Sequence, residues 1–183
     1  MLYSHSLVWP SLTVEWLPDK SMYRPSPFAL TAHLRSKDSE FSVQRLLLGT
    51  HTSDGEQNHL IVGQVKLPIE DKLVDAKYQE NHKEQQFSEK FDTIVKINHE
   101  GEVNRARFMP QKPNVFATKT IDGSIHIFDY YKHQSFDKEK GSKPNLILTG
   151  HDKEGYGLSW SPTQSGYLLS GSDDRKINLY KVE

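Results

Sequence analysis

Apolar and polar residues alternate over short stretches in the last third of the chain. Leu158 and Trp160 occupy every second position, and Ile177 and Leu179 repeat this spacing after a polar turn. A period of two is typical of a β-strand with one buried face. The pattern and the short apolar runs between the turns therefore predict four strands. These strands are expected near 146–148, 157–160, 167–170 and 177–180.

The same pattern occurs earlier in the chain at a constant spacing of 52 residues. The matched pairs are His99 and His151, Phe108 and Trp160, Pro110 and Pro162, Val115 and Tyr167, Asp122 and Asp174, Ile125 and Ile177, Ile127 and Leu179, and Phe128 and Tyr180. A more distant copy, with Trp16 matching Phe108, is spread over 11–18, 45–50 and 59–65. A fixed period of this kind indicates a repeat architecture.

Each unit contains a Gly-His or Asn-His pair, a strand that ends in Pro, and an Asp in a tight turn before the last strand. Four strands in such a unit resemble the WD40 repeat, whose blades form a β-propeller. We therefore expect an all-β fold with antiparallel four-stranded blades. The repeated aromatic residues are expected in the core, because bulky side chains must fill the space between packed blades.

The chain is long enough for about three blades. We expect the first at 1–97 with insertions at 19–40 and 69–93, the second at 98–150, and a partial third at 151–183. Because a propeller needs at least four blades, we interpret the sequence as a piece of a longer propeller. Such an open wedge would have half-covered faces that favour association. The polar insertion that follows residue 69 is expected to be a solvated mobile loop.

Composition excludes several functional classes. The 183 residues include 23 basic and 24 acidic side chains, which gives no general attraction to nucleic acid. The absence of cysteine excludes disulfides and thiolate metal sites, and no apolar run approaches the ~20 residues that span a bilayer. The nine histidines form no metal-binding pattern. We expect no metal, no cofactor and no membrane association.

Candidate catalytic residues have a simpler structural explanation. His151, Ser170 and Asp174 have the side chains of a hydrolase triad, but the set recurs as His99, Thr118 and Asp122. A unique active site would not be duplicated, whereas a buried hydrogen-bond network in each blade would be. We therefore assign these six residues to structural networks and predict no enzymatic activity.

The loops before the second strand of each unit carry acidic residues at matching positions. Glu102 matches Glu154, and Asn104 matches Tyr156. These loops line one face of a propeller around its channel, so carboxylates would gather on one rim. A Lys- or Arg-rich peptide is a suitable partner through charge-assisted hydrogen bonds. The alternative is an acidic loop that only contacts solvent.

Several longer strings are more specific than the repeat. They are 9–14, 48–54, 57–60, 96–107 and 153–160. Together they resemble the retinoblastoma-binding histone chaperones, the small-subunit family of chromatin assembly factor 1, which is shared with deacetylase, remodelling and Polycomb methyltransferase complexes. The resemblance implies a seven-bladed nuclear scaffold that binds histones without catalysis. It also implies partners among the subunits of chromatin-modifying complexes.

The resemblance further implies where peptides bind. The channel face would take the histone H3 tail and short basic motifs, using Glu102, Asn104, Arg105, Glu154, Tyr156 and His51. The family's histone H4 site uses an N-terminal helix and a late loop that we expect to be absent here, so H4 binding would be absent or incomplete. Val8 stands where the family usually has Glu. The alternative function is a WD40 substrate adaptor or another interaction scaffold outside chromatin.

Overall fold

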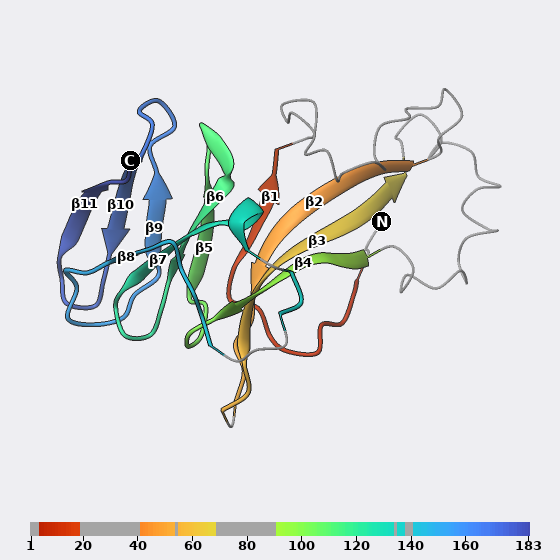
Figure 1. Cartoon of the computed structure of the whole chain (residues 1–183), viewed down its shortest axis with the longest axis horizontal. Coiled ribbons are helices and arrows are strands. Elements are labelled where there is room, and N and C mark those ends of the chain that lie inside the picture. Colours follow the sequence, from red (N-terminus) through yellow and green to blue (C-terminus); the bar gives the residue numbers. More distant parts are fainter. Residues whose placement is uncertain (1–3, 19–40, 54, 69–90, 134, 138–140) are drawn as a thin grey trace.

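The computed structural model describes residues 4–18, 41–53, 55–68, 91–133, 135–137 and 141–183. These residues form three antiparallel sheets that follow one another along the long axis of the molecule (Figure 1). The prediction of an all-β fold with antiparallel four-stranded sheets is confirmed. Most of the two predicted insertions, at 19–40 and 69–93, lies outside the described residues, and strand β4 already begins at Phe91.

The first sheet has the order β1-β2-β3-β4. Its strands are Val14–Leu17, Phe41–Gly49, Asn58–Pro68 and Phe91–His99. The pairing of β3 with β4 shifts register between Val62 and Gly63. A Cβ atom at Gly63 would lie 2.5 Å from the ring of Phe91. Only glycine therefore lets the Phe91 ring lie this close to the strand.

The second sheet has the order β5-β6-β7-β8, and a short 3₁₀ helix follows β7. Its strands are Arg105–Met109, Lys112–Lys119, Ile125–Asp129 and Leu146–Leu148, and the helix η4 is Tyr130–Lys132. The third sheet has the order β11-β10-β9. Its strands are Gly157–Trp160 for β9, Tyr167–Gly171 for β10 and Ile177–Lys181 for β11.

The strand that leads each sequence unit belongs to the sheet before it. The β4 strand pairs with β3, and β8 pairs with β7 through Ile125 and Leu148. The repeat pattern had grouped these two strands with the units that follow them. Periodicity determines the length of a repeat but not the point at which one sheet ends, because either neighbour could pair with the leading strand. Each sequence unit consequently spans two sheets.

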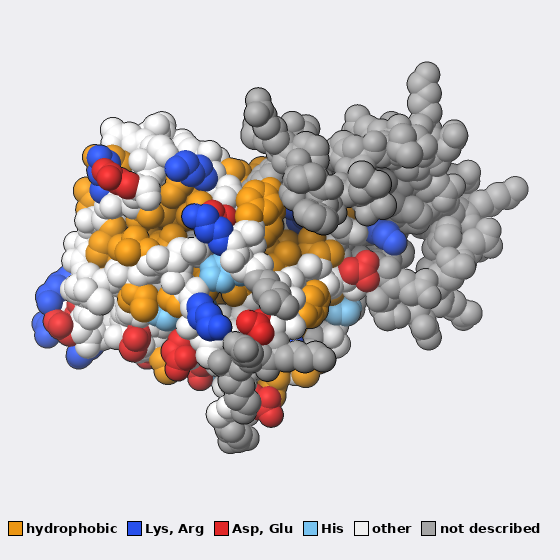
Figure 2. Space-filling view, in the orientation of Figure 1, with side chains coloured by type: hydrophobic (Ala, Val, Ile, Leu, Met, Phe, Trp, Pro, Cys, Tyr) orange, Lys and Arg blue, Asp and Glu red, His pale blue; other side chains and the backbone are white. Residues whose placement is uncertain are grey.

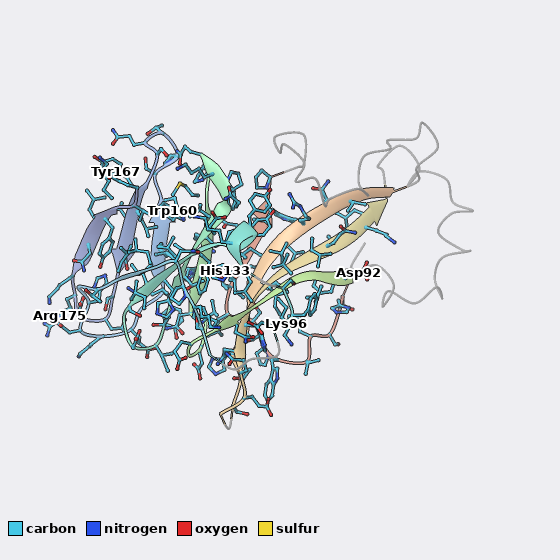
Figure 3. The ribbon with its side chains drawn as sticks, viewed as in Figure 1. Asp92, Lys96, His133, Trp160, Tyr167 and Arg175 are labelled. Atoms are coloured by element: carbon cyan, nitrogen blue, oxygen red, sulfur yellow. The ribbon has the colours of Figure 1, made fainter. Side chains whose placement is uncertain are left out.

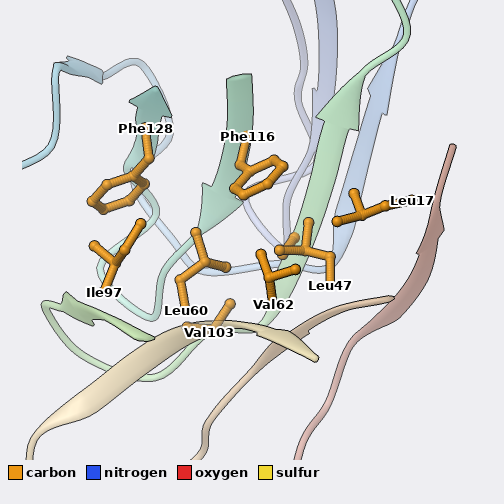
Figure 4. Packing of buried hydrophobic residues seen from close by; sticks show 9 residues of the cluster. Leu17, Leu47, Leu60, Val62, Ile97, Val103, Phe116 and Phe128 are labelled. Carbon is orange, nitrogen blue, oxygen red and sulfur yellow. The ribbon is translucent and has the colours of Figure 1, made fainter. Parts of the chain in front are cut away.

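Two apolar clusters join the sheets. The first lies between sheets one and two and includes Leu47, Leu60, Val103 and Phe116, each no more than 1% exposed (Figure 4). The second lies between sheets two and three and contains Met109, Ala117, Ile125, Ile127, Leu158, Trp160 and Leu168. The predicted core positions Leu158 and Trp160 are confirmed.

The two outermost sheet faces depart from the predicted core. Trp16 is 58% exposed, because Glu15 and Leu17, on the opposite face of β1, point toward the second sheet. Ile177 and Leu179 are 78% and 61% exposed, on the face of sheet three that points away from Trp160. The inward alternation predicted for these three residues is therefore wrong within the described chain. Their burial would require a further layer against each face.

Candidate functional site

The two predicted binding loops lie next to each other. Residues 100–104 precede β5 and residues 149–156 precede β9, and both strands begin at the lower end of the molecule in Figure 1. The β2–β3 connection, which contains His51, reaches the same end. The structure thus brings residues from three parts of the sequence to one rim. We define this rim as His51, Glu102, Asn104, Arg105, Glu154 and Tyr156.

Glu102 is paired with His51 across the junction of the first two sheets. The distance between His51 Nδ1 and Glu102 Oε2 is 2.9 Å, and the two side chains are 42% and 28% exposed. Val103, the next residue, is fully buried and its backbone N–H donates to the Thr50 carbonyl. The buried Val103 anchors the loop, so the position of the Glu102 carboxylate is well determined.

Asn104 connects the loops of the second and third sheets. Its side chain donates from Nδ2 to Glu154 Oε2 at 3.1 Å and to the Gly155 carbonyl at 3.5 Å. Its backbone N–H donates to the carbonyl of Lys119 at 3.0 Å. Asn104 is only 1% exposed, so it orients Glu154 from below. The interpretation that Asn104 itself offers a peptide contact gains no support from this burial.

Arg105 and Tyr156 form the next contact along the rim. The Arg105 side chain donates from Nε to the Tyr156 backbone carbonyl at 2.9 Å. The Tyr156 side chain is 46% exposed, which leaves its ring accessible beside the half-buried Glu154. Among the described residues, no basic side chain forms an ion pair with Glu154. The rim thus presents a carboxylate next to an exposed aromatic ring.

Turns on both sides hold the Glu154 loop in place. Ser172 donates to the carbonyls of Lys153 and Glu154 at 2.6 and 2.8 Å, and the backbone N–H of Asp173 donates to the Glu154 carbonyl. On the other side, a Cβ atom on Gly123 would lie 2.7 Å from the Lys153 carbonyl. Sequence reasoning missed Ser172, because nothing in the repeat pattern indicates which turn contacts which loop.

Below the rim, the third sheet contains a buried polar network. His151 Nδ1 lies 2.9 Å from Asp174 Oδ2, and His151 Nε2 lies 3.1 Å from Ser170 Oγ. Burial opposes ionisation of Asp174, but hydrogen bonds from the Lys176 backbone N–H, the His151 ring and the Asp152 N–H lower its pKa below the ordinary value. These contacts satisfy buried polar groups where the strands meet.

Lys119 extends this network across the junction between the second and third sheets. Its side chain is fully buried, and Nζ donates to Ser170 Oγ at 2.6 Å. Burial lowers the pKa of Lys119, although the carboxylates of Asp174 and Asp173 partly offset the effect. No sequence pattern indicates this role, because the matching position in the third unit is Gly171.

The corresponding network in the second sheet is arranged differently. His99 Nε2 lies 2.7 Å from Thr118 Oγ1, while Nδ1 lies 3.0 Å from the Gly101 carbonyl. Asp122, expected to join this set, instead accepts hydrogen bonds from Thr120 and Ser124. The structure therefore brings together His151, Ser170 and Asp174 in one network, but only His99 and Thr118 in the other.

Other charged groups surround the rim. Lys176 Nζ lies 2.6 Å from Asp152 Oδ2, and Glu100 is exposed. In the view of Figure 2, acidic side chains gather along the lower edge of the molecule, with basic ones at its corner. Figure 3 shows Arg175, in the β10–β11 turn, at this same end. The lower edge is thus acidic with interspersed cations.

The described residues contain no group of three or more His, Cys, Asp or Glu side chains that could hold a metal ion. Among the same described residues, no helix is long and apolar enough to cross a membrane. The polar clusters of this region are satisfied by hydrogen bonds within the protein, which is the usual arrangement for structural networks.

Successive antiparallel sheets, a repeated His–Ser/Thr pair and loops gathered at one end define a fragment of a WD40-type β-propeller. Among solved structures, the WD40 domain of coronin from Toxoplasma gondii matches with a TM-score of 0.49 and 20% sequence identity. The match covers 75% of this chain and 30% of that one, so the chain spans less than a third of that structure's length.

Residues 1–69 match the family described as the histone-binding protein RBBP4 or a component of the CAF1 complex. This N-terminal portion of the chain is therefore of the RBBP4 type, and the family predicted from the sequence strings is confirmed for it. The match includes His51 and the first three strands, β1 to β3. The rim residues of the second and third sheets lie outside the matched segment.

Proposed function

We propose that this chain is part of a non-enzymatic histone-binding scaffold, and that its rim binds basic peptides such as the histone H3 tail. The match of residues 1–69 to a family described as histone-binding carries this proposal. The geometry of the rim supports a peptide ligand rather than a reaction, because the His–Ser/Thr pairs are buried below it and bonded within the sheets.

The chemistry of the rim favours Lys and Arg side chains. Glu154 accepts a hydrogen bond from the neutral amide of Asn104, so its negative charge remains available to a cation. Glu102 lies opposite the uncharged or singly charged ring of His51. Charge-assisted hydrogen bonds between such carboxylates and basic side chains are stronger than neutral ones. The exposed Tyr156 ring adds an aromatic face that attracts cations.

The roles of the rim residues divide into contact and support. Glu154, Glu102 and Tyr156 are at least partly exposed and would contact the peptide. Asn104 and Arg105 hold the neighbouring loop through Glu154 and the Tyr156 carbonyl. Prior ordering of the contact groups reduces the entropy lost on binding. The two kinds of residue should therefore respond differently to substitution.

An H3-tail peptide titrated calorimetrically into the chain tests the proposal. Glu154→Gln removes the charge with little change in shape and should weaken binding by about 2–5 kcal/mol if the ion pair is desolvated. Glu183→Gln serves as the matched control, because that side chain is 82% exposed beyond the last strand. Equal affinity of the Glu154→Gln variant and the unaltered chain would contradict the proposed site.

The wider setting follows from the same proposal. A histone-binding scaffold of this type would act in the nucleus with subunits of chromatin assembly, deacetylase, remodelling and methyltransferase complexes. A substrate adaptor outside chromatin is the second candidate, since its peptides would use the same rim. Affinity capture from nuclear extract separates the two: recovery of histones and chromatin enzymes supports the scaffold, and recovery of ubiquitin-ligase subunits supports the adaptor.

A further inference from the structure

The two ends of the described molecule present apolar sheet faces to solvent. On the third sheet, Leu169, Ile177 and Leu179 are 47%, 78% and 61% exposed. On the first sheet, Val14 and Trp16 are 66% and 58% exposed. The two sheets lie at opposite ends of the long axis in Figure 1. Contiguous exposed apolar groups of this kind are typical of interaction surfaces.

The molecule itself shows what such faces bind. Ile125 and Ile127, which match Ile177 and Leu179 in the repeat, are 0% and 4% exposed because the third sheet covers them. The covering sheet contributes Trp160, which is 6% exposed. The outer face of sheet three therefore resembles a surface that, one repeat earlier, packs against a tryptophan-bearing first strand.

The face of the first sheet supplies the matching half. Trp16 lies on β1, the first strand of its sheet, as Trp160 lies on β9. At the internal junction, Trp160 Nε1 donates to the Arg107 carbonyl at 3.0 Å. The residue that matches Arg107 on the third sheet is Ser159. A second copy could thus place its Trp16 against this sheet and donate to the Ser159 carbonyl.

We propose that two copies of this chain associate head-to-tail, with the outer face of sheet three in each copy packed on the Trp16 face of sheet one in the other. An interface between two different surfaces either closes into a ring or extends indefinitely. Two copies of three sheets give six, which falls within the range of about four to eight blades that closes a propeller. The assembly is therefore a closed dimer.

Light scattering coupled to size-exclusion chromatography measures the outcome directly. The expected mass is twice the 21.1 kDa of one chain over a dilution series. Ile177→Asp combined with Leu179→Asp should give monomers, and Ile121→Asp, at an apolar position that is 47% exposed in the β6–β7 turn, should leave the dimer intact. A monomer from the unaltered chain, or an open-ended polymer, would overturn the closed dimer.

Cysteine cross-linking gives a second test that does not depend on destabilising the fold. The chain contains no cysteine, so introduced thiols report only on their own contact. Val14→Cys with Leu179→Cys should form an intermolecular disulfide under mild oxidation, with two bonds for each closed dimer. Ile121→Cys with Leu179→Cys is the matched control and should not cross-link. Equal cross-linking in both variants would mean random collision and would exclude the proposed interface.

Discussion

The stability of the fold should depend on pH through His99. This ring is fully buried, with Nδ1 donating to the Gly101 carbonyl and Nε2 facing the Thr118 hydroxyl. Burial lowers the pKa of His99 from 6.5 to about 4, and the nearby His126 adds to the effect, while the contact with Gly101 opposes it. The neutral ring is therefore part of the folded structure.

The sign and size of the effect follow from linkage. Because the pKa is lower in the folded state, the unfolded chain binds more protons below pH 6.5. Stability is complete above that pH and is lost as the pH falls toward 4. The shift corresponds to about 3 kcal/mol in total, of which about 2 kcal/mol is lost between pH 7 and pH 5.

Urea denaturation followed by circular dichroism at several pH values tests this reasoning at fixed protein concentration. His99→Gln should reduce the loss of unfolding free energy between pH 7 and pH 5 by about 2 kcal/mol relative to the unaltered chain. His5→Gln, at an exposed position, should leave the slope unchanged. An NMR titration provides an independent measurement. A His99 ring that titrates near pH 6.5 in the folded protein would refute the argument.

Three further substitutions test the packing beneath and within the site. Trp160→Phe removes the donor to the Arg107 carbonyl and should lower the unfolding free energy by about 1–3 kcal/mol in urea denaturation. Leu168→Ala, at a fully buried position, should cost about 2–5 kcal/mol in the same assay. Gly155→Ala would place a Cβ 2.7 Å from the Gly171 carbonyl and should weaken H3-peptide binding in calorimetry by displacing the Glu154 loop. Gly171→Ala, whose Cβ would meet nothing closer than 3.9 Å, should bind normally.

The repeat predicted the parts of the structure that depend on local pattern. Alternation at Leu158 and Trp160 located a strand and its buried face, and the loops that carry Glu102 and Glu154 do lie together. A strand shows its period in a few residues, and equivalent loops of stacked sheets must meet at one end. These features needed no knowledge of which sheet packs on which.

Features that depend on contacts between sheets could not be predicted in this way. Lys119 is buried because Ser170 of the next sheet accepts its hydrogen bond, and Ser172 matters because its turn reaches the Glu154 loop. In both cases the partner lies far along the chain or on another element. Trp16 illustrates the reverse: the alternation correctly predicts a face, but burial needs a neighbouring layer.

Asp122 and Asp174 show why equal positions in a repeat can have different partners. Asp174 is followed two residues later by Lys176, which offers only its backbone N–H to Oδ1, so Oδ2 remains available to the His151 ring. Asp122 is followed by Ser124, whose hydroxyl and backbone N–H both donate to Oδ1, and Thr120 donates to the same atom. Such local side-chain donors compete with more distant partners for a carboxylate. If this competition decides the network, Ser124→Ala combined with Thr120→Val should free Asp122 to approach His99. The pKa of His99, followed by NMR, should then rise above about 4, since a carboxylate beside the ring favours its charged form.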